Sequence, residues 1–313
     1  MFGLILRRLF AAIPIMLIVA TVVFLLLRLA PGDPARVIAG DMASEEAIAA
    51  IRADMGLDQS VAVQYARWMG SLVRGDLGHS VLSRQPVTQL ISARLGPTMS
   101  LAFSAIALTI LTAVPLGVLS AWRHKKPIDR GIMAGAVLAF SVPAFVVGYL
   151  LILVFSVKLG WLPVQGYTPL ADGLGEYVSH LVLPTVTLAT VFVALITRIT
   201  RASMLDILGE DFVRTARAKG VTEKYVLFRH ALRNAAVPIV TIIGVAITTL
   251  ISGVVVTETI FNISGVGRLI VDSVLARDYP VVQGTILFFS FIYVFINLVI
   301  DMAYVLLDPR IRY

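Results

Sequence analysis

The sequence predicts an all-α, polytopic membrane helix bundle with six transmembrane helices and both termini in the cytoplasm. Three observations lead to this fold class: the composition, the length of the apolar stretches, and the distribution of Lys and Arg. Of the 313 residues, 58% are hydrophobic and 14% are charged, and the mean hydropathy is +0.90. A soluble domain carries about 25% charged residues. Water is therefore not the only solvent of this chain.

Six stretches of the chain lack Asp, Glu, Lys and Arg, and each is long enough to cross a bilayer as a helix. The hydrocarbon core requires about 20 apolar residues in helical conformation. We place the spans at about residues 9–28, 98–122, 131–157, 178–200, 235–257 and 280–305. A single membrane domain, residues 1–313, accounts for the whole chain. Pro143, Pro184 and Pro238 are candidate kinks within these spans.

The first apolar stretch also has the basic residues before it that a cleaved signal peptide would have. Its apolar run covers residues 9–27, whereas the core of a signal peptide has about 7–15 residues. The sequence therefore favours a retained span over a signal peptide.

Lys and Arg are distributed unevenly between the connecting segments. If the N-terminus is cytoplasmic, the inside segments are residues 1–8, 123–130, 198–233 and 308–313, and they hold 16 of the 26 Lys and Arg residues. Cytoplasmic loops of membrane proteins carry this excess. The asymmetry accounts for most of the net charge of +7, so the basic excess indicates contact with membrane lipid and not with nucleic acid.

The segment 29–97 lies outside in this arrangement and is predicted to be an extracytoplasmic helical segment. Ser44 is suited to cap a helix that carries Glu45 and Glu46 in its first turn and ends at Gly56. A second amphipathic helix follows Ser60. Two roles remain open for these helices: a cap packed on the bundle, or a surface that receives a soluble substrate carrier.

The cytoplasmic segment 201–234, which we name the coupling loop, has the pattern of two short helices joined by a tight turn. Residues 211–219 suit a helix, Gly220 suits a positive φ, and Thr222 with Glu223 suits the start of a second helix. The loop contains the large apolar residues Phe212, Val213, Tyr225, Leu227 and Phe228. Such side chains need cover from the bundle, from lipid or from the groove of a partner.

The coupling loop resembles the EAA loop of ABC importer permeases, a motif of Glu-Ala-Ala, three residues, Gly, nine residues and Ile-x-Leu-Pro. Aligned on Gly220, the triplet is Arg214-Thr215-Ala216. Ala216, Gly220 and Leu232 match the motif, whereas its Glu, Ile and Pro are absent. Residues 214–220 and 229–235 are similar to the variant of the dipeptide, oligopeptide, nickel and glutathione branch of these permeases.

The resemblance to this branch extends along nearly the whole chain. Short segments similar to those of the branch recur in order at residues 29–34, 56–58, 75–78, 159–163, 258–262, 265–267, 277–280 and 308–312. The resemblance implies the type I ABC importer permease fold and a multi-pass, pore-forming subunit in the bacterial cytoplasmic (inner) membrane. It also implies a second homologous permease subunit, two cytoplasmic ATPase subunits and an extracytoplasmic solute-binding protein as partners.

We expect this chain to be a transport subunit without an ATPase site of its own, and so not an enzyme. The sequence has no Gly-x-x-x-x-Gly-Lys-[Ser/Thr] phosphate loop, so ATP and Mg are expected on the partner ATPase subunits and no cofactor is expected on this chain. The resemblance favours di- and oligopeptides as the substrate, with glutathione or nickel chelates as alternatives.

Two sets of site residues follow. For contact with the ATPase we expect Asp211, Arg214, Thr215, Ala216, Arg217, Lys219, Gly220 and Leu232. The basic residues of this set have a second interpretation, because any inward loop is basic. For the translocation path we expect the small and hydroxyl residues Thr248, Thr249, Ser252 and Gly253 of the fifth span. Small residues also serve helix packing in bilayers, so packing is the alternative here.

Two other classes of membrane protein were considered. A proton-coupled secondary transporter needs ionisable groups near the bilayer midplane, but Glu258 and Asp301 fall at span ends, where water or a partner would satisfy them. An intramembrane enzyme needs a catalytic or metal-binding cluster, but His79, His124, His180 and His230 are scattered in the sequence. His-Glu-x-x-His and Gly-x-Ser-x-Gly do not occur, and Cys is absent. We therefore expect no catalytic residue and no metal site.

Overall fold

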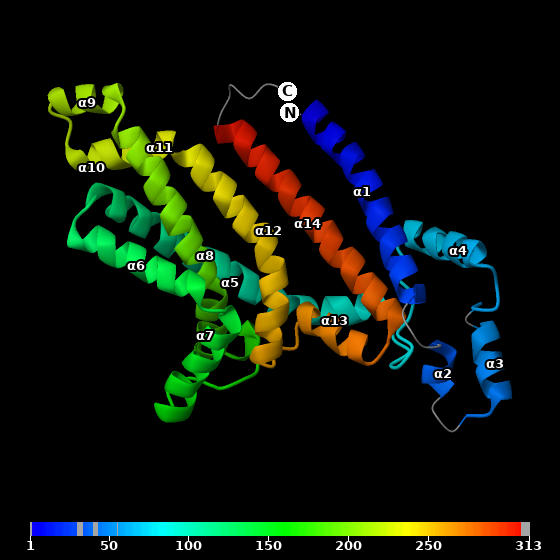
Figure 1. Ribbon diagram of the computed structural model, residues 1–313. Helices are drawn as coiled ribbons and strands as arrows, with labels where there is room; N and C mark the ends of the chain where they lie inside the picture. Colours follow the sequence, from blue (N-terminus) through cyan, green and yellow to red (C-terminus); the bar gives the residue numbers. More distant parts are fainter. Residues whose placement is uncertain (1, 30–33, 40–42, 55, 308–313) are drawn as a thin grey trace. The chain divides into compact units, whose positions relative to one another are not determined.

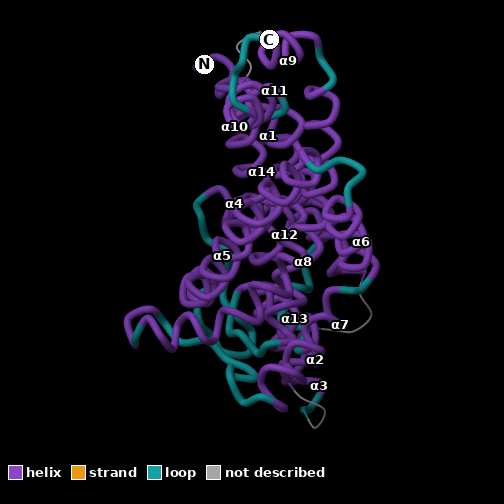
Figure 2. The backbone as a smooth tube through the Cα atoms, turned by 90° about the vertical axis from the view of Figure 1, so that its left-hand side faces the viewer, coloured by secondary structure: helices purple, strands orange, loops and turns teal. Residues whose placement is uncertain are grey.

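The computed structural model describes residues 2–29, 34–39, 43–54 and 56–307. Within these ranges the secondary structure is helical, apart from one isolated antiparallel bridge between His79 and Pro86 (Figures 1 and 2). The predicted all-α class is confirmed. The predicted inside segment 308–313, and residues 30–33 of the segment 29–34, lie outside the described residues.

The helices follow one another along the chain with short connections. They are α1 (Phe2–Leu29), α2 (Pro34–Ala39), α3 (Glu45–Asp54), α4 (Val61–Val73), α5 (Val87–Trp122), α6 (Pro127–Ser141), α7 (Ala144–Leu151), the π-helical η1 (Ile152–Lys158), the short η2 (Leu170–Asp172), α8 (Leu174–Leu208), α9 (Asp211–Ala218), α10 (Glu223–Tyr225), the π-helical η3 (Val226–Ala231), α11 (Leu232–Asn234), α12 (Ala236–Ile260), α13 (Val266–Leu275) and α14 (Tyr279–Leu307).

Four of the described helices are long and apolar enough to cross a membrane: α5, α8, α12 and the Tyr279–Met302 part of α14. They contain the second, fourth, fifth and sixth predicted spans. The bent pair of α6 with Ala144–Lys158 counts as a fifth and holds the third predicted span. The apolar stretch Phe10–Leu25 of α1 lies within the first predicted span and is shorter than it. The count of six spans and the cytoplasmic location of both termini stay predictions.

The third predicted span, residues 131–157, is not one straight helix. The axis bends by 101° between α6 and α7. Val142 leaves the helical region, with φ −92° and ψ 125°, and Pro143 follows it with ψ 138°. Proline lacks an N–H donor and disfavours helical backbone in the residue before it, which explains the break. By contrast, Pro184 lies inside the continuous helix α8, and Pro238 lies in the first turn of α12.

The chain packs as two compact units, of which the larger comprises Pro97–Ser264 with Phe295–Tyr313. Its centre is α8, which contacts α6, α7 and α12. Side chains from α5, α8 and α12 form its main hydrophobic core, with Leu101, Phe192, Ile196 and Leu250 among the buried members. The spans of this unit are therefore arranged around α8.

The other unit comprises Met1–Gly96 with Gly265–Val294. A hydrophobic cluster at its centre joins the first turns of α5 to α13 and α14 through Val87, Val266 and Val281. The two amphipathic helices predicted in the outer segment are present as α3 and α4, and the Ser44 hydroxyl accepts a hydrogen bond from the N–H of Ala47 at 3.3 Å. The short helix α2 was not predicted.

Candidate coupling loop and translocation path

Gly220 closes the first helix of the coupling loop. Its N–H donates to the carbonyl oxygen of Arg217 at 2.9 Å, and the N–H of Val221 donates to that of Ala216 at 3.2 Å. This pair of bonds defines a Schellman turn, which requires the left-handed region at its central residue. Gly220 has a φ of +80°, and a Cβ added there would meet nothing within 4 Å. The positive φ, and not a lack of space for a side chain, therefore explains why glycine occupies this position.

Two of the three basic residues predicted to face a partner are paired within the loop itself. The Arg217 guanidinium donates to both carboxylate oxygens of Glu223, at 2.7 and 3.1 Å, and so ties α9 to the start of α10. Arg214 contacts Asp211 at 3.2 Å, one turn away on an exposed face. Lys219 is exposed. These contacts shape the loop, and they do not prevent the same face from meeting an acidic surface.

The remaining predicted residues of the loop divide between its surface and its packing. The Thr215 hydroxyl donates to the Asp211 carbonyl oxygen at 3.0 Å and lies on the exposed face. Ala216 is buried, and Leu232 packs against a cluster at the ends of α5 and α8. Thr222 occupies the N-cap position of α10, although its side chain makes no cap hydrogen bond.

Three of the five large apolar side chains of the coupling loop are exposed. Val213 is buried, and Leu227 packs with Met204 into the cluster at the ends of α5 and α8. Phe212, Tyr225 and Phe228 are 43%, 49% and 55% exposed. The bundle therefore covers only part of the apolar surface that the sequence predicts must be covered.

A groove lies beside two of these exposed rings. It is lined by Thr222, Lys224, Tyr225, Phe228 and Arg229. The loop thus presents two aromatic rings and an arginine, residue types that are enriched in protein interfaces.

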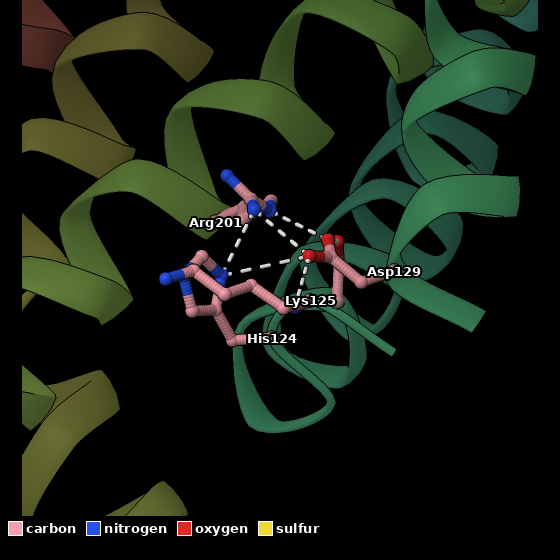
Figure 3. A network of polar contacts seen from close by, with 5 residues as sticks. His124, Lys125, Asp129 and Arg201 are labelled. Carbon is pink, nitrogen blue, oxygen red and sulfur yellow. Dashed lines mark hydrogen bonds and ion pairs between the residues drawn. The ribbon is translucent and has the colours of Figure 1, made fainter. Parts of the chain in front are cut away.

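An ion pair joins Arg201, which opens the coupling loop and lies within α8, to Asp129 in the first turn of α6. Arg201, at the start of the loop, donates from Nε to Asp129 Oδ1 at 2.6 Å and from Nη2 to Oδ2 at 2.8 Å (Figure 3). The Ser120 hydroxyl and the Lys125 N–H donate to the same carboxylate, at 2.5 and 2.9 Å. The Arg201 guanidinium also donates to His124 Nδ1 at 3.0 Å. The Asp129 side chain is 4% exposed and that of Arg201 is 23% exposed, so the carboxylate is buried while the guanidinium reaches the surface. We name this network the clamp.

Sequence reasoning missed this clamp. Asp129 is the one carboxylate in the basic segment 123–130, and it lies in the first turn of a helix that opens with Pro127. A lone acid among basic residues at a helix start was the available signal. Its partner lies 72 residues away along the chain, so spacing alone did not identify Arg201.

Close helix packing continues the clamp into the bundle. A Cβ added at Gly117 of α5 would lie 2.5 Å from Thr200 Cβ and 2.9 Å from the carbonyl oxygen of Thr197, both on α8. Only glycine permits this approach. The clamp and the contact at Gly117 therefore hold α8 close to α6 and α5.

The four residues predicted for the translocation path have different surroundings on α12. Thr249 and Ser252 are exposed on the larger unit, and Thr248 is half-buried. A Cβ added at Gly253 would lie 2.7 Å from the Leu188 side chain of α8. Gly253 therefore lies close to α8, and its place in a translocation path stays a prediction, as do those of Thr248, Thr249 and Ser252.

Polar side chains also join the ends of α5, α8 and α12 opposite to the coupling loop. The Thr98 hydroxyl donates to Glu258 Oε1 at 2.6 Å, and Ser104 shares a hydrogen bond with Thr185 at 2.7 Å. The sequence placed Glu258 at a span end, where water or a partner would satisfy it, and in the structure its side chain is fully buried. Protein donors, and not water alone, satisfy this carboxyl group because the helices close around it.

These features define a class: a polytopic helical membrane protein whose coupling loop exposes aromatic and basic side chains. The sequence matches the family described as "Binding-protein-dependent transport system inner membrane component" over residues 113–313. Residues 1–102 match its companion, "Binding-prot-dependent transport system membrane comp, N-term". The chain belongs to this family of ABC importer permeases.

Related permeases match the chain over its full length. A probable peptide ABC transporter permease of Sinorhizobium fredii is 50% identical, covering 99% of each chain. A glutathione transport system permease of Salmonella paratyphi A is 45% identical, covering 100% of each.

A solved structure has the same fold. A chain of the MetNI methionine ABC transporter, in inward-facing conformations, matches with a TM-score of 0.59 and 16% identity, covering 71% of this chain and 97% of that chain. Together these findings make the protein a multi-pass permease subunit of the bacterial cytoplasmic membrane. It is a transport component and not itself an enzyme.

Proposed function

We propose that this chain forms part of the pore of an importer that moves small peptides, chiefly di- and oligopeptides, across the cytoplasmic membrane. The observation that carries the substrate class is the full-length identity of 50% to a probable peptide transporter permease. The segments of the peptide-transporting branch, distributed from residue 29 to residue 312, support the same class.

The working assembly contains this chain, a second homologous permease, two cytoplasmic ATPase subunits and an extracytoplasmic solute-binding protein. ATP and Mg bind to the ATPase subunits, because this chain has no phosphate loop to hold them. The exposed apolar surface of α14 supports the presence of a second permease. Although the span of α14 has a mean hydropathy of 2.1, only 11% of it is buried within this chain. The rest faces lipid and the partner permease.

The coupling loop is the ATPase contact in this proposal. α9 exposes Phe212, Arg214 and Thr215, and the neighbouring groove exposes Tyr225 and Phe228. A partner that covers these rings removes apolar surface from water, and the basic residues set its orientation. Closure of the ATPase subunits then moves α9, and the clamp at Arg201 passes the motion to α5 and α6.

Glutathione is the second candidate substrate, because a glutathione permease is 45% identical over the full length. It is itself a tripeptide with free carboxylates, so the two substrates differ little in size and polarity. The difference between them resides in the binding protein and in the few residues of the path.

Competition for uptake separates the two substrates. The complete complex is reconstituted in liposomes with the binding protein outside and ATP inside, and uptake of a labelled dipeptide is measured. Unlabelled di- and tripeptides with ordinary α-peptide bonds are expected to suppress the uptake, and glutathione, whose first bond is a γ-glutamyl bond, is expected to leave it unchanged. Uptake of labelled glutathione with no uptake of peptides would assign the chain to the second substrate.

A further inference from the structure

One apolar face of the outer helix α4 packs against α1. The rings of Tyr65 and Trp68 lie 5.1 and 5.4 Å from the ring of Phe24, centroid to centroid. Tyr65 Oη and Thr21 Oγ1 share a hydrogen bond of 2.8 Å. Phe24 is almost completely buried by this contact. Figure 1 shows α4 lying across the second half of α1. The helix is therefore anchored at Thr21 and Phe24.

The anchor lies inside the stretch of α1 that the sequence predicts as the first span. The charge-free stretch of α1 covers residues 9–27. At 1.5 Å per residue its 19 residues extend about 29 Å, which matches the roughly 30 Å hydrocarbon core. The stretch has no residues to spare, so its ends lie at the two boundaries of the core. Thr21 and Phe24 precede residue 28 by seven and four residues, or about 10 and 6 Å. α4 therefore meets α1 at or below the outer boundary.

A second apolar face of α4 has no cover within the chain. Ala62 and Ala66 are exposed, and Val63 and Val73 are 42% and 83% exposed. A helix that faced water would carry polar residues at these positions. Next to the anchor, α1 exposes Val22 and Leu25, which are lipid-facing positions of a span. The uncovered face of α4 thus continues a surface that already meets acyl chains.

The polar residues of α4 are confined to a narrow stripe. Gln64, Arg67 and Ser71 recur at helical spacing on the remaining side of the helix. Gln64 Nε2 donates to the carbonyl oxygens of Gln59 and Leu57, at 2.8 and 3.4 Å, so this stripe faces the outer loop. Helices that lie in the membrane interface show this division, with Trp and Tyr at the headgroup level.

We propose that α4 is an interfacial helix that lies in the outer headgroup region, with Ala62, Val63, Ala66 and Val73 against phospholipid. Its contact with lipid then holds the outer segment 29–97 against the membrane. A lipid-facing α4 differs from both roles that the sequence left open. Those roles were a cap packed on the bundle and a surface that receives a soluble substrate carrier.

Single cysteines test this proposal directly, because the chain contains none of its own. Spin labels are attached to Val63→Cys and Ala66→Cys in the reconstituted complex. Their collision rates are measured with oxygen, which concentrates in lipid, and with a water-soluble nickel chelate. Val22→Cys on α1 is the lipid-facing control, and Ala49→Cys on the exposed side of α3 is the aqueous control.

Labels at residues 63 and 66 are expected to collide several-fold more often with oxygen than with the nickel chelate, as at residue 22, whereas residue 49 shows the reverse. A ratio at 63 and 66 like that of residue 49 would overturn the proposal. Protection from both reagents would also overturn it, because protein would then cover the face. Protection that appears only when the binding protein is added would assign the face to the carrier.

Discussion

Gly220 has a backbone conformation that other residues adopt only under strain. Its φ of +80° follows from the two Schellman hydrogen bonds that end α9, and the space around it is open. A β-branched residue in this region costs about 1–3 kcal/mol and displaces the turn between the two helices of the coupling loop. Asparagine tolerates the same region far better.

Gly220→Val is therefore expected to abolish substrate-stimulated ATP hydrolysis by the reconstituted complex, while the chain still inserts in the membrane. Gly220→Asn is the matched control, and it should retain most of the stimulation because its backbone fits the turn. Equal stimulation in the wild type and the valine variant would show that the turn does not position the ATPase contact.

Asp129 and Arg201 form a partly buried pair whose disruption leaves one charge without its partner. Asp129→Asn is expected to lower the stability of the purified chain by about 1–3 kcal/mol in thermal unfolding. The double variant with Arg201→Gln should lose less than the sum of the single losses, because it removes the unpaired guanidinium. Asp211→Asn, which breaks the exposed pair with Arg214, should change stability by no more than about 0.5 kcal/mol. Equal losses of stability at Asp129 and Asp211 would show that the clamp does not stabilise the fold.

At the scale of the elements, the approach of α5 to α8 depends on Gly117. Gly117→Ala places a methyl group within 2.5 Å of Thr200 Cβ, and the nearby carbonyl oxygen of Thr197 cannot rotate away. Overpacking of this kind costs about 1–3 kcal/mol. Gly135→Ala on α6, where an added Cβ meets nothing within 4 Å, is the control and should be neutral or slightly stabilising.

Thermal unfolding of these two variants in detergent is the measurement. If Gly117→Ala unfolded at the same temperature as Gly135→Ala, α5 and α8 would be separated more widely than the structure has them.

Hydropathy and capping signals predicted most of the elements but not their roles. The signals around Ser44 and Gly220 are local, so they identified α3 and the end of α9. The windows of α8 and α14 have mean hydropathies of 2.0 and 2.1, yet 61% of the first and 11% of the second are buried. Burial depends on which faces meet, and hydropathy contains no information about partners. The sequence for this reason did not reveal α8 as the centre of the larger unit.

The candidate site shows the same division between local and tertiary information. The turn at Gly220 was predicted because a glycine between two helix patterns indicates it directly. The pairing of Asp129 with Arg201 and the burial of Glu258 were not predicted, because both arise when distant helices close around a polar group. Gly253 was ambiguous in sequence, since small residues suit both a path and a helix contact, and its approach to Leu188 indicates the contact.

At the scale of the whole molecule, the chain is a permease of an ABC importer family. It has apolar helices, a coupling loop with exposed aromatic rings, and no Gly-x-x-x-x-Gly-Lys-[Ser/Thr] phosphate loop in its sequence. We propose that transport takes its energy from the ATPase subunits of such an importer. The central claim is that this energy is ATP hydrolysis, coupled through residues 201–234, and not an ion gradient acting on groups within the spans.

Uptake of a labelled dipeptide into liposomes tests this claim most directly. The liposomes hold both permeases and the ATPase subunits, with the binding protein outside, and uptake is compared with and without enclosed ATP and with and without a proton ionophore. Uptake is expected to require ATP and the binding protein and to persist when the ionophore collapses the proton gradient. Uptake that proceeds without ATP and stops with the ionophore would contradict the account.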